Sequence, residues 1–196
     1  MGSNAVRRRC SVPGWLLVAL LAMAGPGPAA AAETLALAGV EYEHRWSRNG
    51  QNEYTPAGQE DLERWRDMLS LVVRADVADA EGLAAVANGL LEDYRKMGAI
   101  VRTDSRPATP GQPAEHLIVA LLGGGPMVEA AFARLVLHEG TGVIVVRSRR
   151  AYGEDAATEA GAWLRDHGLV TELALWGWAP LPPIARLQAL PQADAP

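Results

Sequence analysis

The segment from Leu121 to Val146 constrains the fold of this chain more than any other. Its sequence, LLGGGPMVEAAFARLVLHEGTGVIVV, places three glycines and a proline before one apolar stretch and a Glu-Gly-Thr-Gly turn before the next. A helix over residues 127–138 would give the strand, glycine loop and helix of a nucleotide-binding fold, and its residue types favour a helix locally. A strand over residues 127–137 would instead turn through residues 139–142 and pair with residues 143–148 as a hairpin.

The glycine loop lacks the residues that a phosphate-binding loop requires. Val128 stands where the dinucleotide-binding fingerprint has its third glycine, and no lysine followed by serine or threonine closes the loop. We therefore prefer the hairpin, with Gly123, Gly124 and Gly125 as a bend or bulge between strands. No nucleotide, and no other cofactor, is expected.

The first 32 residues have the pattern of a secretory signal peptide. Three arginines at positions 7–9 precede a short apolar run from Trp15 to Met23, and small residues at positions 30 and 32 indicate cleavage before Glu33. An uncleaved anchor is the alternative, but the apolar run is short for a membrane span. We expect a periplasmic or secreted protein with no stable membrane anchor after cleavage.

Removal of this segment changes the composition. Cys10 is the only cysteine, so the exported chain would have no disulfide, no thiolate metal site and no cysteine nucleophile. Three of the 18 basic residues and none of the 23 acidic residues leave with the segment, which gives a net charge of −8. That excess of acidic residues disfavours binding to nucleic acid or to an anionic membrane surface.

Hydrophobic periodicity predicts a single α+β domain over residues 33–179. Strands are predicted at residues 34–42, 52–55, 71–75, 99–104, 116–122 and 172–179, in addition to the hairpin. Helices are predicted at residues 56–69, 79–97 and 154–167. Residues 180–196 are rich in proline and alanine and are predicted to be a flexible tail.

The three predicted helices each have recognisable ends and a buried stripe. In the first, Thr55 is the cap, Pro56 takes the first helical position, and Leu62, Trp65 and Leu69 face the core. In the second, Asp79 is the cap, Gly98 ends the helix, and the buried stripe is Leu83, Val86, Leu90, Tyr94 and Met97. In the third, Gly168 ends the helix, and the inward residues are Ala156, Ala160, Trp163 and Leu164.

Several dispersed residues resemble those of a bacterial exported family related to PsbP-like and DcrB-like domains. They are Tyr54-Thr55-Pro56, Gly58, Trp65, Met68, PAEHLIV at residues 113–119, Phe132, Arg134, Arg150 and Tyr152. The resemblance implies an α/β/α sandwich around a mainly antiparallel, twisted sheet, and a non-enzymatic binding or accessory role. The lipid-bearing cysteine of DcrB-like members has no counterpart after the apolar run, so the resemblance does not imply membrane attachment.

No residue pattern identifies a catalytic or metal site. Past residue 32 the serines lie at positions 47, 70, 105 and 148, none within G-x-S-x-G, and His44, His116, His138 and His167 are isolated from one another. The best candidate for a metal site is His44 with Glu41 and Glu43, but strand alternation places the two glutamates on one face and His44 on the other. We therefore predict neither catalytic residues nor metal ligands.

Two residue pairs are predicted to bind a ligand. Trp176 and Trp178 would share one face of the predicted last strand, where aromatic rings can stack on a sugar or anchor a partner. Arg147 and Arg149 would share a face of another strand and could hold an anion, with Arg150 opposite. Burial of the tryptophans under a helix and solvation of the arginines are the alternative interpretations.

Together these features predict an exported, non-catalytic binding or accessory protein whose partner is an envelope protein or a small ligand. The alternative is an envelope hydrolase of undetermined class. A plain apolar groove in the structure would favour binding, whereas a pocket lined by two converging carboxylates or a histidine–acid pair would favour hydrolysis.

Overall fold

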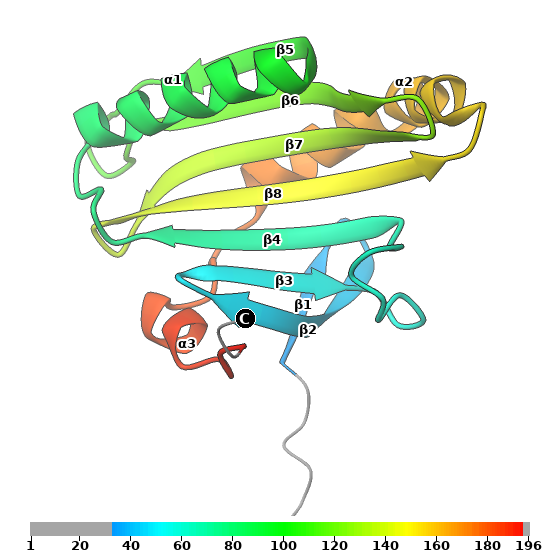
Figure 1. Ribbon diagram of the computed structural model, residues 1–196. Helices are drawn as coiled ribbons and strands as arrows, with labels where there is room; N and C mark the ends of the chain where they lie inside the picture. The colour runs from blue at the N-terminus through cyan, green and yellow to red at the C-terminus, as the bar shows by residue number, and fades with distance from the viewer. Residues whose placement is uncertain (1–32, 194–196) are drawn as a thin grey trace, which may run out of the picture. The chain divides into compact units, whose positions relative to one another are not determined.

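A computed structural model describes residues 33–193, which form one eight-stranded antiparallel sheet with three helices (Figure 1). The strand order is β1-β2-β3-β4-β8-β7-β6-β5. The strands are β1 (Thr34–Leu37), β2 (Val40–Arg48), β3 (Gln51–Thr55), β4 (Asp67–Arg74), β5 (Gly98–Arg106), β6 (Glu115–Gly124), β7 (Met127–His138) and β8 (Thr141–Tyr152). The predicted α+β class with a mainly antiparallel sheet is confirmed, whereas the predicted signal peptide lies outside the described residues.

The predicted central hairpin is confirmed. Strands β7 and β8 pair along their whole length, from Met127 opposite Tyr152 to His138 opposite Thr141. Glu139 and Gly140 connect them with φ angles of 51° and 74°, the left-handed pair that a type I′ turn requires. The three glycines end β6 and turn the chain into β7, so the helical, nucleotide-binding alternative is wrong.

The two long helices pack on opposite faces of the sheet (Figure 1). On the face that we call the α2 face, Phe132, Val143 and Val145 pack against α2 (Ala156–Gly177). On the other, the α1 face, Ala131 and Ala133 of β7 belong to the cluster that packs with α1 (Ala80–Met97). Strand alternation therefore sends successive β7 and β8 side chains to two separate cores.

Helix α1 has the predicted start and end. The side chain of Asp79 accepts a hydrogen bond from the backbone N–H of Gly82 at 2.8 Å, and the helix ends at Met97, before Gly98. Of the predicted buried stripe, Leu83 and Tyr94 are buried, but Met97 is 51% exposed. The prediction was wrong for Met97, which lies in the last turn of the helix, where the sheet does not cover it.

The predicted helix over residues 56–69 is wrong. Residues 56–66 are an irregular loop, and Asp67 begins β4, four residues before the predicted strand at Leu71. Met68 and Leu69 are both buried because alternate residues of β4 reach opposite faces of the sheet. Trp65 is buried as predicted, but in the loop rather than on a helix.

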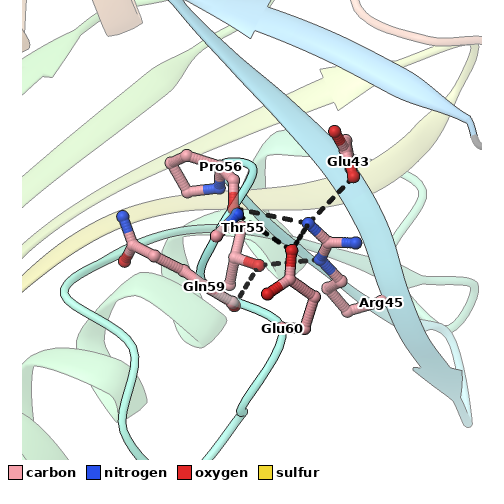
Figure 2. Close-up of polar contacts among 7 residues, drawn as sticks. Glu43, Arg45, Thr55, Pro56, Gln59 and Glu60 are labelled. Atoms are coloured by element: carbon pink, nitrogen blue, oxygen red, sulfur yellow. Dashed lines mark hydrogen bonds and ion pairs between the residues drawn. The ribbon is translucent and has the colours of Figure 1, made fainter.

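Arg45 of β2 fixes the start of this loop, where a helix N-cap was predicted (Figure 2). Its Nε donates to Thr55 Oγ1 at 2.9 Å, and its Nη2 donates to the carbonyl of Pro56 at 3.3 Å. The hydroxyl of Thr55 in turn donates to the carbonyl of Gln59 at 2.6 Å, so it does not cap a helix. Glu43 and Glu60 balance the guanidinium charge, with Glu43 Oε2 at 2.9 Å from Nη2.

The first predicted strand is divided in two. Ala38 and Gly39 have φ angles of 52° and 76° and connect β1 to β2 through a two-residue turn. The predicted turn at Asn49-Gly50 is confirmed and leads into β3.

Helix α2 continues past its predicted end and takes in most of the predicted strand over residues 172–179. Gly168 does not end the helix: a Cβ there would lie 3.3 Å from Leu164 Cδ1 and 3.9 Å from the ring of Phe132, so glycine permits close packing. The C-terminus of α2 is instead capped by Arg134, whose Nη1 donates to the carbonyls of Leu175 at 2.6 Å and Trp178 at 3.0 Å.

The predicted flexible tail is wrong over residues 180–193. Leu181, Leu187 and Leu190 are buried on the α2 face, and α3 (Ile184–Gln188) forms within this segment. The backbone N–H of Ala193 donates to the carbonyl of Ser47 at 2.8 Å. Three leucines spaced between prolines therefore give the segment enough apolar surface to pack on the sheet.

Candidate functional site

Arg147 is a charged residue buried inside the protein. It lies on β8 between Leu69 of β4 and Phe132 of β7, on the α2 face. Only 7% of its surface is exposed. A buried charge requires a partner, because the loss of hydration is otherwise costly.

Asp67 is the charged partner of Arg147, and Tyr42 completes the network. Arg147 Nη2 lies 3.2 Å from Asp67 Oδ2, and the hydroxyl of Tyr42 donates to Asp67 Oδ1 at 2.7 Å. Burial raises the pKa of Tyr42 above its usual range, and the charge of Asp67 adds to the rise, so Tyr42 keeps its proton. Both carboxylate oxygens of Asp67 are thereby satisfied.

The guanidinium group of Arg147 is not fully satisfied. Its Nε is buried and has no hydrogen-bond acceptor among the residues that the structure describes. Buried donors are almost always paired, so an unpaired one calls for an explanation, such as a bound water or ion. Arg147 therefore has donor capacity left after Asp67 is bound.

A cavity of about 260 Å³ adjoins Arg147, and we call it the Arg147 pocket. It lies between β8, the β1–β2 turn and helix α2. Its other lining residues are Ala38, Val40, Trp163, His167, Val170 and Thr171. The volume is slightly below that of pockets for drug-sized molecules, so the pocket suits a small ligand.

Helix α2 supplies one wall of the pocket at a spacing of four residues. Trp163, His167 and Thr171 follow one another along a single helix face. The rings of Trp163 and His167 lie 5.5 Å apart at 36°, and Arg147 Cζ is 5.9 Å from the Trp163 ring. The pocket thus combines a guanidinium, an imidazole, a hydroxyl and an aromatic wall, which is the chemistry that holds a small carboxylate.

Arg149 shares the α2 face with Arg147, as predicted, but it does not line the pocket. It stands opposite Asp67 in the β4–β8 register, two positions along from the pair of Leu69 and Arg147. The structure therefore does not bring the two arginines together on one cavity.

The predicted tryptophan pair does not lie on a strand. Trp176 belongs to α2 and Trp178 is the residue at its C-cap. Arg106 of β5 lies over the Trp176 ring with Cζ 4.0 Å from its centroid, while the carbonyl of Trp178 binds Arg134. The extension of α2 removes the shared strand face on which the prediction of a stacking platform depended.

Two histidines contact serines, but neither pair forms a catalytic triad. His44 Nε2 lies 2.7 Å from Ser47 Oγ, yet Ser47 is fully buried and donates to Asn52. His44 faces Tyr54, away from Glu43, so strand alternation divides the metal corner as expected. Burial is the main influence on the pKa of His44 and lowers it.

The second pair is more open. His116 Nδ1 lies 2.9 Å from Ser105 Oγ at the sheet surface, and burial lowers the pKa of His116. Its Nε2 is buried without a partner in the described part of the chain. A triad needs an acidic group on that second nitrogen to orient the imidazole, and none of the described residues supplies it.

Residues 33–193 offer neither a metal-binding cluster nor a membrane-spanning helix. No group of three or more His, Cys, Asp or Glu side chains in this range is placed to hold a metal ion. None of the helices in this range is long and apolar enough to cross a membrane.

The sequence identified Arg147 but missed the rest of its pocket. His167 and Thr171 were missed because the helix was predicted to end at Gly168, and the four-residue spacing from Trp163 would have linked them on a longer helix. Asp67 was assigned to a helix that does not exist. Tyr42 carried no signal beyond its place on a strand.

Comparison with known proteins does not identify a family. No family model matches the chain, and no curated protein matches it. Among solved structures, a similar one is PA94 of Pseudomonas aeruginosa, a protein of unknown function. It is 14% identical, with a TM-score of 0.45, over 78% of this chain and 99% of that chain. A likeness at that level identifies neither a family nor a function.

Proposed function

We propose that the protein is an exported, non-catalytic binding protein that holds a small carboxylate in the Arg147 pocket. The observation that carries the proposal is the buried Nε of Arg147. This N–H group has no acceptor in the described part of the chain, and the residue is only 7% exposed. A bound carboxylate would supply that acceptor. Charge-assisted hydrogen bonds of this type are shorter and stronger than neutral ones.

The other pocket residues support a ligand with an apolar body. Trp163 offers an aromatic wall, and Val40 and Val170 offer aliphatic contacts beside the guanidinium. Aromatic side chains bury large areas at low entropic cost, so a flat or branched apolar group would gain affinity there. The volume of about 260 Å³ limits the ligand to a few carbon atoms or a single ring.

Benzoate and its uncharged analogue benzamide provide a direct test. We expect benzoate to bind by calorimetry and to raise the melting temperature, whereas benzamide has almost the same shape and should bind at least tenfold more weakly. At a hundredfold excess over Kd, a ligand stabilises the folded state by about 2.7 kcal/mol, which a thermal shift detects readily.

Matched variants locate the binding. Arg147→Lys keeps a positive charge beside Asp67 but loses the planar guanidinium, so benzoate binding should be lost. Arg149→Lys, on the same strand and face but outside the pocket, should bind as the wild type does. The proposal fails if benzoate and benzamide bind alike, if neither binds, or if both variants behave identically.

The export that we propose has a separate measurement. A signal peptide of residues 1–32, with cleavage before Glu33, predicts that the mature protein recovered from the cell envelope begins at Glu33. N-terminal sequencing reads this directly. A full-length form confined to the cytoplasm would contradict the proposal.

We also propose that the sheet and its helices form an α/β/α sandwich like that of PsbP-like and DcrB-like domains. Support comes from α1 and α2 packing on opposite faces of the sheet. The alternative function, an envelope hydrolase, is supported only by the contact between Ser105 and His116, which lacks an orienting acid among the described residues.

A further inference from the structure

The strand β5 forms one edge of the sheet and pairs only with β6 (Figure 1). Its nine residues are exposed except for Ile100 and Asp104, which are partly buried, and a bulge lies between Ile100 and Arg102. Within the described residues, the strand makes no backbone hydrogen bond beyond the β6 ladder and the α1 cap at Gly98. A free edge offers a row of N–H and C=O groups to another strand.

The two edges of the sheet differ in length. At the opposite edge, β1 has only four residues, and a very short edge strand gives little room for pairing with another chain. The edge at β5 is more than twice as long. Of the two edges, β5 is therefore the one that can accept a further strand.

Charges of alternating sign follow the β5 edge. Arg102, Asp104 and Arg106 share the α2 face, because the residues opposite the first two in β6 belong to the core on that face. Arg102 Nη2 lies 3.3 Å from Asp104 Oδ2, and Asp104 also accepts from the backbone N–H of Ser105 at 2.8 Å. The side chains of Arg102 and Asp104 are 51% and 43% exposed, so both remain accessible to a partner.

The alternation of charge is self-complementary in an antiparallel pair. If β5 of a second copy pairs with β5 about a two-fold axis at Thr103, each Arg102 stands opposite Asp104 of the second copy. Opposite charges at facing positions stabilise a strand pair, and so do facing threonines. The two threonines at position 103 then face each other on the α1 face.

Other registers are less favourable. An axis at Asp104 would bring like charges together, Asp104 with Asp104 and Arg102 with Arg106, and an axis at Arg102 would face arginine with arginine. An axis at Ser105 would pair Asp104 with Arg106, but it would set Pro107, which has no N–H to donate, opposite Thr103. The sequence of β5 therefore favours the axis at Thr103.

The flank of α2 next to β5 carries exposed apolar side chains. Leu169 and Leu173 are 66% and 60% exposed. Glu172 and Trp176 complete this flank at the spacing of one helix face, and both contact arginines of β5, at 3.3 Å and 4.0 Å. Val101, on β5 itself, is 48% exposed. Three of the five exposed large apolar side chains of residues 33–193 thus lie at the β5 edge.

We propose that the protein forms a two-fold symmetric dimer in which β5 pairs antiparallel with β5 of a second copy, with the axis at Thr103. The two sheets join into one, and the two α2 helices lie on the same side of it with Leu169 and Leu173 of each turned toward the other. Such an interface must be self-complementary, which the alternating charges provide. The interface uses no residue of the Arg147 pocket, so it stands apart from the proposed function.

Sedimentation equilibrium of the intact chain tests the dimer. We expect twice the mass of one chain at high concentration, falling to the mass of one chain on dilution. Asp104→Arg should weaken dimerisation by at least about tenfold, because two facing pairs in each dimer change from attraction to repulsion. Glu41→Arg makes the same change of charge at an exposed residue near the other edge of the sheet, and should dimerise as the intact chain does.

A mixture of two variants separates loss of pairing from damage to the fold. Arg102→Glu should also be monomeric alone, because the new glutamate would face Asp104 of the second copy. An equal mixture of Arg102→Glu and Asp104→Arg chains should restore the dimer, since both facing pairs then join opposite charges. A misfolded variant would not be rescued by its partner.

Cysteine cross-linking tests the register. Facing residues of an antiparallel pair have Cα atoms about 4.5–5.5 Å apart, within the range that a disulfide spans. In the intact chain with Cys10→Ser, Thr103→Cys should therefore form a disulfide-linked dimer on mild oxidation. Ser105→Cys is the matched control and should remain unlinked, because in this register position 105 faces position 101.

Four results would overturn the proposal. They are a chain that is monomeric at every concentration, a dimer that Asp104→Arg leaves intact or that Glu41→Arg weakens equally, a mixture that stays monomeric, and cross-linking through position 105 in place of 103. The first would show that the charges of β5 keep the edge unpaired, which is the common role of charged residues on an edge strand.

Discussion

At the scale of single residues, two tryptophans make the same type of contact with an arginine but differ in burial. Arg150 lies over Trp65 with Cζ 3.9 Å from the ring, and Arg106 lies over Trp176 at 4.0 Å. The two cation–π contacts are nearly equal in distance. Trp65, however, is 2% exposed, whereas Trp176 is only partly buried.

Replacement by alanine should therefore affect the two sites unequally. We expect Trp65→Ala to lower the free energy of unfolding by about 3–5 kcal/mol, the range for emptying a large aromatic site in a core. Trp176→Ala loses a similar cation–π contact but less buried area, so its loss should be below about 2 kcal/mol. Chemical denaturation of both variants measures the difference, and equal losses would show that the arginine contact dominates.

The Arg147 pocket shows what single residues can and cannot reveal from sequence. Arg147 was recognised because strand alternation places it with Arg149 on one face. Its depth of burial was not visible, because burial depends on α2 and on the β1–β2 turn packing over β8. Asp67, eighty positions away in the chain, becomes its partner only when β4 and β8 pair.

At the scale of elements, those with local signals were predicted and those set by distant partners were not. Helix α1 carries its own cap at Asp79, and the β7–β8 hairpin carries its own turn at Glu139-Gly140. The stretch from Leu62 to Leu69 has helical spacing, but pairing of β4 with β3 and β8 outweighs that local preference.

Helix α2 was predicted to be too short for a related reason. Gly168 has the appearance of a helix stop, and the alternation near Trp176 and Trp178 resembles a strand. In the structure the glycine allows the ring of Phe132 to approach, and the helix ends nine residues later at Gly177, where Arg134 binds the carbonyls of Leu175 and Trp178. A glycine that serves packing cannot be told from one that ends a helix without knowledge of the opposing surface.

At the scale of the described molecule, the two faces of the sheet are closed in different ways. The α2 face is covered by α2 and by residues 180–193, whose three leucines join the same core as Tyr42 and Tyr54. On the α1 face, α1 packs over β5, β6 and β7, at the β5 edge of the sheet (Figure 1). The C-terminal segment therefore covers β1 to β4 on the α2 face, and α2 covers the remaining strands on that face.

Removal of the C-terminal segment should consequently destabilise the whole sheet. A chain that ends at Ala179 would lose the buried side chains of Leu181, Leu187 and Leu190, each worth about 1.5–3 kcal/mol of apolar burial. It would also lose the hydrogen bond from Ala193 to Ser47 and the contact of Pro182 with His138 at 3.1 Å. Domains of this size have a total stability of only about 5–15 kcal/mol, so the loss is a large share of it.

We expect the chain ending at Ala179 to melt at least about 10 °C below the intact chain and to bind a hydrophobic dye through the uncovered α2 face. A chain ending at Ala193, which keeps all three leucines, is the matched control and should melt with the intact chain. The full-length variant with Leu181, Leu187 and Leu190 changed to serine separates the contribution of apolar burial from that of the hydrogen bonds made by Ala193 and Pro182. It should reproduce most of the loss if apolar burial dominates. A truncated chain that melted within two or three degrees of the intact one would show that residues 180–193 rest on the sheet without stabilising it, because buried leucines cannot be removed from a core at so small a cost.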